Sequence, residues 1–430
     1  MYEIDERLYE LDKDCNPIMV GVIGVGQMGG EIISQINLMR GMRVAIAVDL
    51  EYETVLKAFE DAGSTDEIVC IDNLEEAEKV SKDSKLIAAK DYRIAARLSV
   101  VDVVVDCTGL PEMGARISLE CINYKKHIVM MNVECDITIG PILKKLANNT
   151  GLIYSLAAGD EPGSIVELYR FARAIGYDVV AAGKGKNNPL DIYATPKDYL
   201  EAAAKREMNP RMLVEFIDGS KTMIEMAAVS NATGLVPDIR GMHGPKCDIN
   251  NLLKTFSIKS QGGILNRTGV VDYSIGNVAP GVFIIFTVQN KMLINGLKQR
   301  GMGDGPNYLL YRPYHLCGAE TPLTIAQAVI YRESTAHPMK KLVSECIAVA
   351  KRDLKKGEIL DRIGEYCYRG SIELAEIAKE NNMLPLGLAY GAKLKVNVHK
   401  DEILTYDMVD FDEDNSVLLQ LRRIQDKIMV

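Results

Sequence analysis

The N-terminal part of the chain, up to about Asp160, contains short, continuous apolar runs that are separated by helical or turn-like segments. The run at 18–23 precedes a glycine-rich turn, and apolar residues then recur at helical spacing from Ile32 to Met39. A second run, 44–49, follows and ends in an acid. Continuous runs of this length are typical of parallel strands that are covered on both faces. The pattern therefore predicts a strand–helix–strand unit of about 30 residues.

The turn after the first run reads Gly24-Val25-Gly26-Gln27-Met28-Gly29. In such a turn Gly24 allows the sharp bend, Gly26 lets the backbone approach a pyrophosphate, and Gly29 lets the helix pack close to the strand. The N–H groups of the first helical turn, at Gln27 and Met28, would face the phosphates. Because strand, turn, helix and strand follow in order, the sequence predicts a Rossmann domain that binds a nicotinamide dinucleotide. The alternative is a flexible glycine loop in another kind of α/β protein.

Asp49 ends the second run, at the position beyond Gly29 where a dinucleotide-binding fold carries its acidic residue. A carboxylate at this position accepts hydrogen bonds from the ribose hydroxyls of the adenosine and repels a 2′-phosphate. No basic residue follows directly, because the next residues are Leu50-Glu51-Tyr52. The cofactor is therefore NAD or NADP, with NAD favoured.

Two later runs, 100–106 and 128–131, lead into small polar residues. In a doubly wound sheet, ligands lie beyond the carboxyl ends of such strands. Thr108, Gly109 and Asn132 are therefore candidates for contacts with the ribose and the nicotinamide. Each of them is explained equally well as an ordinary turn residue.

A run at 152–155 leads to Gly159-Asp160-Glu161-Pro162-Gly163-Ser164, and a helix is expected from Ile165 onwards. Two adjacent carboxylates at a strand–helix junction can serve as acid, base or metal ligands. The alternative is that Asp160 caps the helix and Glu161 lies in its first turn.

A strand expected at 177–182 leads to Gly183-Lys184-Gly185-Lys186-Asn187-Asn188-Pro189, which we expect to form a loop. Flexible glycines would let Lys184 and Lys186 hold a phosphate or a carboxylate, or give a proton to a developing alkoxide. The segment lacks the pattern of a Walker loop. The alternative is a basic turn on the surface.

Glu215, Asp218 and Lys221 follow one another at a spacing of three, near a glycine that favours a turn. Beside a nicotinamide, such a lysine can polarise a carbonyl oxygen while a carboxylate positions water or substrate. The alternative is a salt-bridged turn. His243 and His315 are further candidates for proton transfer or metal binding, although a lone histidine is more often structural. No spacing of histidines and acids defines a metal site.

The 430 residues carry a net charge of −9, which disfavours nucleic acid or an anionic membrane as a partner. The nine cysteines form no C-x-x-C pair, which is typical of reduced thiols in the cytoplasm. No apolar run approaches the ~20 residues of a membrane span. We therefore expect a cytoplasmic protein whose partner is a small-molecule substrate.

Two other regions bear on domain organisation. Residues 61–90 are rich in charge and are expected to form a solvated helical insertion without catalytic residues. Residues 342–360 and 392–405 share an apolar–turn–apolar pattern, which indicates short strands in a small β-rich module from about 338 to 413.

Several of these motifs together resemble homoserine-dehydrogenase-type oxidoreductases. More closely, the chain resembles the deoxyxylulose-phosphate reductoisomerase-like (DRL) proteins, and this similarity covers nearly the whole chain. The matching stretches are 131–134, 158–162, 183–189, 215–223, 241–245 and 312–315.

The resemblance implies a homodimer of α/β chains with three domains. These are a Rossmann doubly wound sheet in 1–155, an α/β catalytic and dimerisation domain in 156–337, and a small β-rich SAF-like domain in 338–430. It also implies NADPH-dependent conversion of 1-deoxy-D-xylulose 5-phosphate to 2-C-methyl-D-erythritol 4-phosphate, a step of isoprenoid biosynthesis. Two features differ: Asn132-Val133 replaces the Asn-Lys of homoserine dehydrogenases, and Asp49 suits NADH.

The main hypothesis is an NAD(P)-dependent oxidoreductase that acts on a small, polyhydroxylated and phosphorylated carbonyl compound. Lys184 or Lys186 would hold the anionic end of the substrate. Lys221, beside Glu215 or Asp218, would polarise the oxygen and relay its proton. Asp160 would act in catalysis and, with Glu161, bind a divalent metal ion if the reaction includes a rearrangement. The alternatives are a homoserine-dehydrogenase-like enzyme for another hydroxy acid or sugar acid, and a non-catalytic dinucleotide sensor.

Overall fold

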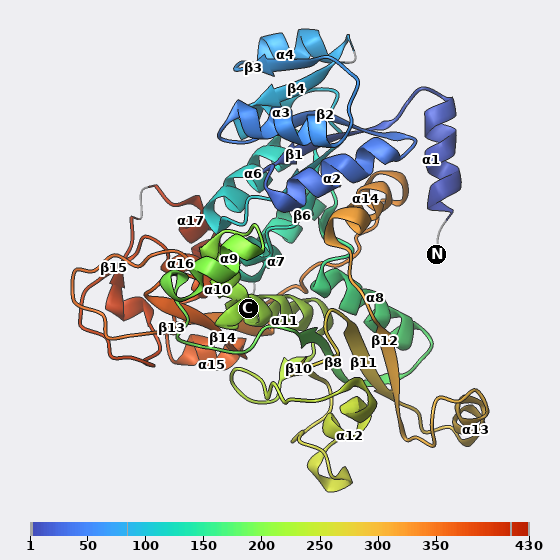
Figure 1. The fold of residues 1–430 in the computed structure, drawn as a ribbon, viewed down its shortest axis with the longest axis vertical. Coiled ribbons are helices and arrows are strands. Elements are labelled where there is room, and N and C mark those ends of the chain that lie inside the picture. Colours follow the sequence, from blue (N-terminus) through green and yellow to red (C-terminus); the bar gives the residue numbers. More distant parts are fainter. Residues whose placement is uncertain (1–2, 84, 413–414, 429–430) are drawn as a thin grey trace. The chain divides into compact units, whose positions relative to one another are not determined.

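The computed structural model describes residues 3–83, 85–412 and 415–428 (Figure 1). The chain divides into two units. Unit 1 contains Met1–Gly163, Leu316–Lys340 and Gln420–Val430. Unit 2 contains Ser164–His315 and Lys341–Leu419. Each unit is therefore assembled from segments that are distant in the sequence.

Within the described part of unit 1, seven strands form one parallel sheet in the order β3-β4-β2-β1-β5-β6-β7. Their bounds are β1 Ile18–Ile23, β2 Met42–Val48, β3 Ile68–Ile71, β4 Leu86–Ala89, β5 Val103–Asp106, β6 His127–Met130 and β7 Tyr154–Leu156. The strand order reverses at β1, as in a doubly wound Rossmann sheet. The predicted α/β fold class is confirmed.

Helices cover this sheet on both faces, as the topology of crossover connections requires. α2 contacts α3 on one side, while α4, α5, α6 and α7 form a second chain of contacts. The helices are α1 Ile4–Lys13, α2 Gln27–Leu38, α3 Tyr52–Asp61, α4 Leu74–Ser81, α5 Tyr92–Arg97, α6 Pro111–Asn123 and α7 Val133–Asn149.

The prediction for residues 61–90 is wrong. This segment is part of the sheet, because it contains β3, α4 and β4, and β4 pairs with the interior strand β2. The residues of β4 are all buried. The apolar runs Ile68–Ile71 and Leu86–Ala89 are short and lie among charged residues that belong to α4 and to the turns. A helical insertion was therefore inferred where two strands extend the sheet.

A later segment of the chain returns to unit 1 as helix α14 (Cys317–Ala326), which packs on α2. A Cβ added at Gly318 would lie 2.4 Å from Cβ of Glu31, so the glycine allows the two helices to approach closely. The hydroxyl of Thr324 accepts a hydrogen bond of 2.8 Å from the backbone N–H of Ala158. This contact fixes the loop after β7.

A side chain of helix α17 (Val417–Ile428) forms hydrogen bonds with the backbone of α7. α7 contains Pro141, which has no N–H to donate and disturbs the helical hydrogen bonds around it. One turn of α7 is bridged by the buried amide of Gln425. Its Oε1 accepts from the N–H of Ile142 at 3.1 Å, and its Nε2 donates to the carbonyl of Thr138 at 3.1 Å. These two backbone groups are i and i+4 partners in a regular helix.

Unit 2 is built on a mixed sheet, in which five described strands have the order β12-β11-β8-β10-β9. β8 is parallel to β10 and antiparallel to β11. The strands are β8 Asp178–Lys186, β9 Val236–Pro237, β10 Val270–Ile275, β11 Val282–Thr287 and β12 Asn307–Arg312. The helices of this region are α8 Glu161–Ala174, α9 Leu200–Lys205, α10 Pro210–Ile217, α11 Ser220–Thr233, α12 Leu252–Thr255 and α13 Lys291–Gln299.

The C-terminal part of unit 2 contains the antiparallel strands β13 (Ser344–Ala350) and β14 (Tyr368–Leu374). β14 lies against α11, where the N–H of Gly370 donates to the hydroxyl of Ser220 at 2.8 Å. The two segments with the shared pattern pair with each other through bridges at Leu354–Val398 and Ile359–Lys393. The remaining elements are α15 Ala375–Glu380, α16 Leu386–Ala389, β15 Lys393–Leu394 and β16 Val409–Asp410. The division into three domains stays a prediction.

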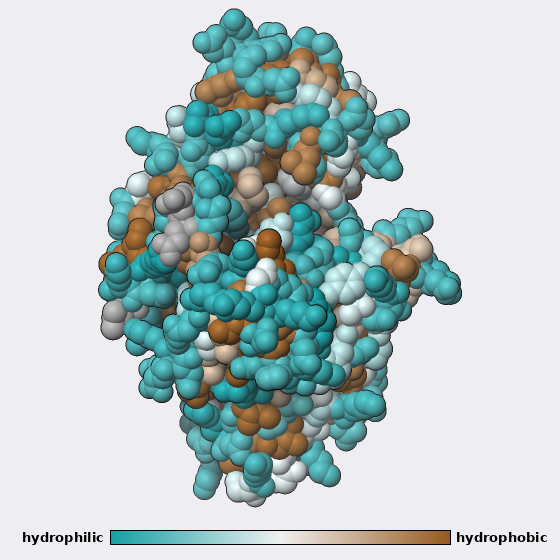
Figure 2. Space-filling view, turned by 90° about the vertical axis from the view of Figure 1, so that its left-hand side faces the viewer, coloured by the Kyte–Doolittle hydropathy of each residue, from teal (hydrophilic) through white to brown (hydrophobic). Residues whose placement is uncertain are grey.

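The polarity of the surface is that expected from the composition of the chain. The face drawn in Figure 2 is mostly hydrophilic, with apolar residues scattered among polar ones. Of the helices that the structure describes, none combines the length and the apolar character needed to cross a bilayer.

We expect Gln425→Ala to lower the free energy of unfolding by about 1–3 kcal/mol, because it removes the side-chain acceptor of the buried N–H of Ile142 and the donor to the carbonyl of Thr138. Urea unfolding followed by circular dichroism measures the change. Gln420→Ala is the matched control, since Gln420 is an exposed glutamine on the same helix. Equal stability of the two variants would contradict the bridging role of Gln425.

Candidate active site

The glycine turn of unit 1 has the geometry that a dinucleotide requires. Gly24 has a φ of +87°, and a Cβ there would lie 2.8 Å from the carbonyl carbon of Cys107. A Cβ at Gly29 would lie 2.1 Å from the carbonyl oxygen of Gly24, so only glycine allows α2 to begin this close to β1. Gly26, by contrast, faces open space. The backbone at Gly26 is thus accessible at the point where a pyrophosphate would approach.

Asp49 is fixed against this turn. Its Oδ2 accepts a hydrogen bond of 2.7 Å from the N–H of Val25, and its Oδ1 accepts one of 2.7 Å from the N–H of Leu50. The carboxylate at the end of β2 is therefore held beside the glycine turn. Each oxygen has a further lone pair that a ribose hydroxyl can use.

One side of the turn opens into a hollow of about 800 Å³. It is lined by Gly26, Gln27 and Gly30, by side chains of α2 and α3, and by Ala319 of α14. Gln27 is exposed and Met28 is half-buried at the start of α2. The predicted cofactor residues of the turn thus lie together at one accessible edge of unit 1.

Asn132 is used entirely within the protein. Its Oδ1 accepts from the N–H of Cys135 and caps α7, while its Nδ2 donates to Asp106, Thr108 and the carbonyl of Leu110. Asp106 also accepts from the N–H and the hydroxyl of Thr108 at 2.9 and 2.7 Å. Burial raises the pKa of Asp106. This network fixes the loop that carries Thr108 and the exposed Gly109. Asn132 stabilises the loop through its hydrogen bonds.

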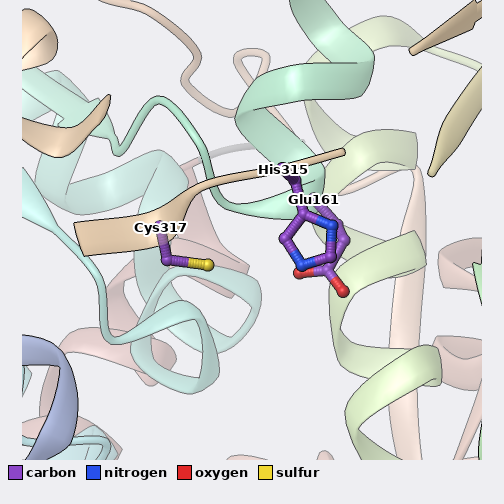
Figure 3. Close-up of side chains that lie close together, drawn as sticks. All are labelled: Glu161, His315 and Cys317. Atoms are coloured by element: carbon purple, nitrogen blue, oxygen red, sulfur yellow. The ribbon is translucent and has the colours of Figure 1, made fainter. Parts of the chain in front are cut away.

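Asp160 and Glu161 are both buried at the start of α8. The thiol of Cys317 donates to Asp160 Oδ1 at 3.8 Å, and a carboxylate oxygen of Glu161 lies within 4.8 Å of the Cys317 sulfur. Figure 3 draws Glu161 and Cys317, both of unit 1, together with His315, which ends a segment of unit 2. Cys317 was missed from sequence, because it is far from Glu161 along the chain.

The predicted loop that carries Lys184 and Lys186 is wrong: both residues belong to strand β8, and both are buried. The alternative of a basic surface turn is excluded for the same reason. The intervening glycines face the other side of the strand. A Cβ at Gly183 would lie 2.2 Å from the carbonyl oxygen of Asp272, and one at Gly185 would lie 2.0 Å from the N atom of Ala279. These glycines therefore permit close packing and do not make the backbone flexible.

The two lysines have different partners. Lys184 forms a buried ion pair with Glu225 of α11, whereas the ammonium group of Lys186 donates to the carbonyl of Phe216. Burial, helped by the charge of Lys184, lowers the pKa of Lys186 to about 8. Lys186 can therefore lose and regain a proton near neutral pH.

The two acids of the predicted cluster of Glu215, Asp218 and Lys221 each form an ion pair with a residue outside it. Glu215 pairs with Arg211 at 3.2 Å on the same helix. Asp218 is fully buried and pairs with Lys351 at 2.7 Å, and burial raises the pKa of Asp218 while Lys351 opposes this effect. Lys221 is half-buried in the first turn of α11.

Lys221 lies one helical turn before Glu225, so these side chains share a face of α11. Glu225 is a functional candidate that sequence reasoning missed. The available signal was a single carboxylate in the otherwise apolar stretch Met223–Val229, which is buried throughout. A buried carboxylate generally needs a cationic partner.

His243 is oriented by a buried carboxylate. Its Nε2 lies 2.8 Å from Asp238 Oδ2, and the same oxygen accepts from the N–H and the side chain of Asn266. Burial opposes the charged form, but the hydrogen bonds from Asn266 and His243 outweigh it and lower the pKa of Asp238. The preceding residue, Met242, has a φ of +65°. Such strain in a non-glycine residue is often found at functional sites.

The loop around His243 is fixed by a second acid. Asp272 accepts from the N–H groups of His243, Gly244 and Tyr273 at 3.1, 3.0 and 2.8 Å. The ring of His243 is thus held by Asp238 and its backbone by Asp272.

Comparison with known proteins indicates which class of protein this chain resembles. Residues 159–321 match the family "Oxidoreductase DRL, catalytic domain". Among curated proteins, no sequence matches this chain. A probable dehydrogenase of Thermotoga maritima has a similar structure, with 15% identity over 74% of this chain and 90% of its own, and a TM-score of 0.43.

Two further solved structures are similar to parts of the chain. The myo-inositol dehydrogenase of Lactobacillus casei, in complex with NAD(H) and myo-inositol, is 13% identical over 46% of this chain and 53% of its own, with a TM-score of 0.32. The 1-deoxy-D-xylulose 5-phosphate reductoisomerase of Zymomonas mobilis, in complex with NADPH, is 15% identical over 49% of this chain and 57% of its own, with a TM-score of 0.34.

The family match covers Asp160, the lysines of β8, the helix with Lys221 and Glu225, and the loop of His243. The chain is therefore an oxidoreductase. Within that class, residues 159–321 are similar to the catalytic domain of the DRL oxidoreductases, the family that the sequence motifs resemble.

The lowered pKa of Lys186 predicts a particular dependence of stability on pH. Between pH 8 and 10.5 the unfolded chain holds a proton that the folded protein has lost, so the free energy of unfolding rises with pH. Lys186→Met removes this contribution. The free energy of unfolding of the wild type, minus that of Lys186→Met, should therefore increase with pH in this window, by at most about 1.4 kcal/mol per pH unit.

Urea unfolding at several pH values across this window tests the prediction. Lys205→Met is the control, since Lys205 is exposed on α9 and should give a difference that does not change with pH. A flat difference for Lys186→Met as well would show that Lys186 titrates normally in the folded protein.

Proposed function

We propose that this protein is an NAD(H)-dependent oxidoreductase that transfers hydride to or from a small, polyhydroxylated and phosphorylated carbonyl compound. The observation that carries the proposal is the glycine turn with Asp49 bonded to the N–H of Val25. In the same chain, residues 159–321 match an oxidoreductase catalytic domain. A dinucleotide site and a catalytic domain together define a cofactor-dependent redox enzyme.

On the cofactor side, the exposed backbone at Gly26 and the start of α2 would bind the pyrophosphate. Asp49 would accept the ribose hydroxyls and repel a 2′-phosphate, which favours NADH over NADPH. Thr108 and Gly109 would line the loop nearer the nicotinamide. The nicotinamide supplies the hydride when it is bound.

On the substrate side, Lys221 would polarise the carbonyl oxygen and relay its proton, with Glu225 in place of the predicted Glu215 and Asp218. Glu225 lies one helical turn after Lys221 on the same face of α11, whereas Glu215 and Asp218 pair with Arg211 and Lys351. Lys186, with a pKa of about 8, is a second group that can exchange a proton near neutral pH. His243, whose ring is held by Asp238, lies in the same matched segment.

The donor set at the start of α8 fits a divalent metal ion. Asp160 and Glu161 are buried carboxylates, and the sulfur of Cys317 lies beside them. A metal ion held there would neutralise the charge of an alkoxide or ene-diolate, as a rearrangement requires.

The substrate that we favour is 1-deoxy-D-xylulose 5-phosphate or a related sugar phosphate, in keeping with the DRL motifs. The second candidate is another hydroxy acid or sugar acid. A non-catalytic dinucleotide sensor is disfavoured, because the segment that matches a catalytic domain contains several buried and paired charges.

Titration with NADH and NADPH, followed by nicotinamide fluorescence, should show tighter binding of NADH. Asp49→Asn keeps one acceptor for the N–H of Val25 but removes the charge. It should raise the affinity for NADPH relative to NADH by about tenfold, the effect of losing about 1.4 kcal/mol of like-charge repulsion. Asp12→Asn, at an exposed carboxylate of α1, is the control. Absence of binding of either dinucleotide by the wild type would overturn the proposal.

Lys221→Met should lower the turnover of 1-deoxy-D-xylulose 5-phosphate or of a sugar-phosphate panel by at least about 100-fold, the usual effect of a lost proton donor. The affinity for NADH should stay unchanged. Lys205→Met serves as the control. Full activity of Lys221→Met would remove Lys221 from the mechanism, and a wild type that binds NADH without turning over any carbonyl would favour the sensor.

A further inference from the structure

A hollow of about 620 Å³ lies in unit 2, outside the residues considered so far. It is bounded by the excursion of the chain between β9 and β10, at residues 246–264, and by Ile275 and Gly276 at the end of β10. Every lining residue belongs to unit 2.

Two lysines, Lys246 and Lys254, line this hollow. Within the part of the chain that the structure describes, neither ammonium group forms an ion pair or a hydrogen bond. The buried lysines Lys184, Lys186 and Lys351 differ from them, because each has a partner inside the protein: a carboxylate for Lys184 and Lys351, and a carbonyl for Lys186. The hollow thus has cationic charge that the protein does not neutralise.

The surrounding sequence is basic in an acidic protein. Residues 246–267 contain four basic residues and one acid, Asp248, although the whole chain has a net charge of −9. Asp248 also lines the hollow, and it balances only one of the two lysines. A local excess of positive charge attracts anions from solution.

The rest of the lining supplies hydrogen-bond donors. Thr255 offers a hydroxyl and Asn251 an amide, while the thiol of Cys247 lies 3.1 Å from the Thr255 hydroxyl. Two ammonium groups, a hydroxyl and an amide provide enough donors for the several oxygens of a phosphate.

The hollow adjoins the strand that carries the buried lysines. Ile275 is the register partner of Lys186, and the N–H of Gly276 donates to the carbonyl of Lys186 at 3.3 Å. β8 and β10 are parallel, so the hollow lies at the carboxyl end of both strands, where α/β sheets commonly bind ligands. Adjacent strands are about 4.8 Å apart. An anion in the hollow would therefore sit next to the end of β8.

We propose that this hollow binds the phosphate group of the substrate, through Lys246 and Lys254. The substrate assignment rests on the proposed function, whereas the oxyanion site follows from the hollow itself. It replaces the predicted role of Lys184 and Lys186, whose ammonium groups already have partners inside the protein. The 2′-phosphate of NADP has the same chemistry and is the other source of such a group.

Calorimetric titration of the full-length protein with inorganic phosphate, at constant ionic strength in chloride, tests the site. Lys246→Gln and Lys254→Gln should each weaken phosphate binding by about tenfold, and the double variant by more. Lys246→Arg should retain binding. Lys259→Gln is the matched control, because Lys259 lies on the same excursion but outside the lining, with its ammonium group 2.7 Å from Asn266 Oδ1.

Equal weakening in Lys246→Gln and Lys259→Gln would reduce the site to general surface charge and overturn the proposal, as would a wild type that binds no phosphate. NADH and NADPH titrations of the same variants separate the two phosphate sources. Unchanged affinities support the substrate, whereas a selective loss of NADPH affinity would assign the hollow to the cofactor and overturn the substrate assignment. Phosphate binding that persists in a protein without affinity for either dinucleotide would refute the proposed function and leave the oxyanion site standing.

Discussion

Two buried lysine–carboxylate pairs are the constraint on which unit 2 depends. Lys184 pairs with Glu225, and Lys351 pairs with Asp218. Removing one partner of a buried pair commonly costs about 3–5 kcal/mol, because the other charge is left without compensation. The second pair joins the C-terminal segment to the connection between α10 and α11, and Lys351 also donates to the carbonyls of Ala194 and Glu365. The C-terminal segment and the mixed sheet are therefore parts of one folded unit.

The lysines of this unit differ in their chemical properties because they differ in their partners. A lysine with a buried carboxylate partner, such as Lys184 or Lys351, is held in place by its ion pair. Lys186 has a carbonyl as its partner and a positive neighbour, so its two protonation states are close in free energy. Lys246 and Lys254 are exposed and remain available to an external anion. These lysines thus fall into three classes: paired with a carboxylate, bonded to a carbonyl, or exposed. The residues that surround them in the sequence do not distinguish these classes.

Much of unit 1 could be predicted from sequence, because buried parallel strands are continuous apolar runs and the glycine turn has few alternative structures. The strands β1, β2, β5, β6 and β7 follow this rule. β3 and β4 were missed because their apolar runs lie among the charged residues of α4 and of the adjoining turns, so that the segment as a whole resembled a solvated helix. The alternation of glycine and lysine at 183–186 is typical of a loop, and only the neighbouring strands show that it is a close-packed strand. Partners such as Asp218 and Lys351 are distant in the chain, and no local pattern connects them.

The bridge from Gln425 to α7 has a consequence for the order in which the protein can fold during synthesis. Unit 1 begins with the segment that ends at Gly163, but one turn of α7 is closed by a side chain that follows the whole of unit 2 in the sequence. At about 5–20 residues per second, the ribosome needs on the order of 10–50 s to translate from Gly163 to Gln425. During this interval the sheet of unit 1 exists without α17, and the groups around Pro141 stay open to water or to chaperones. The side chain that bridges α7 is thus available to unit 1 only after the whole of unit 2 has been synthesised.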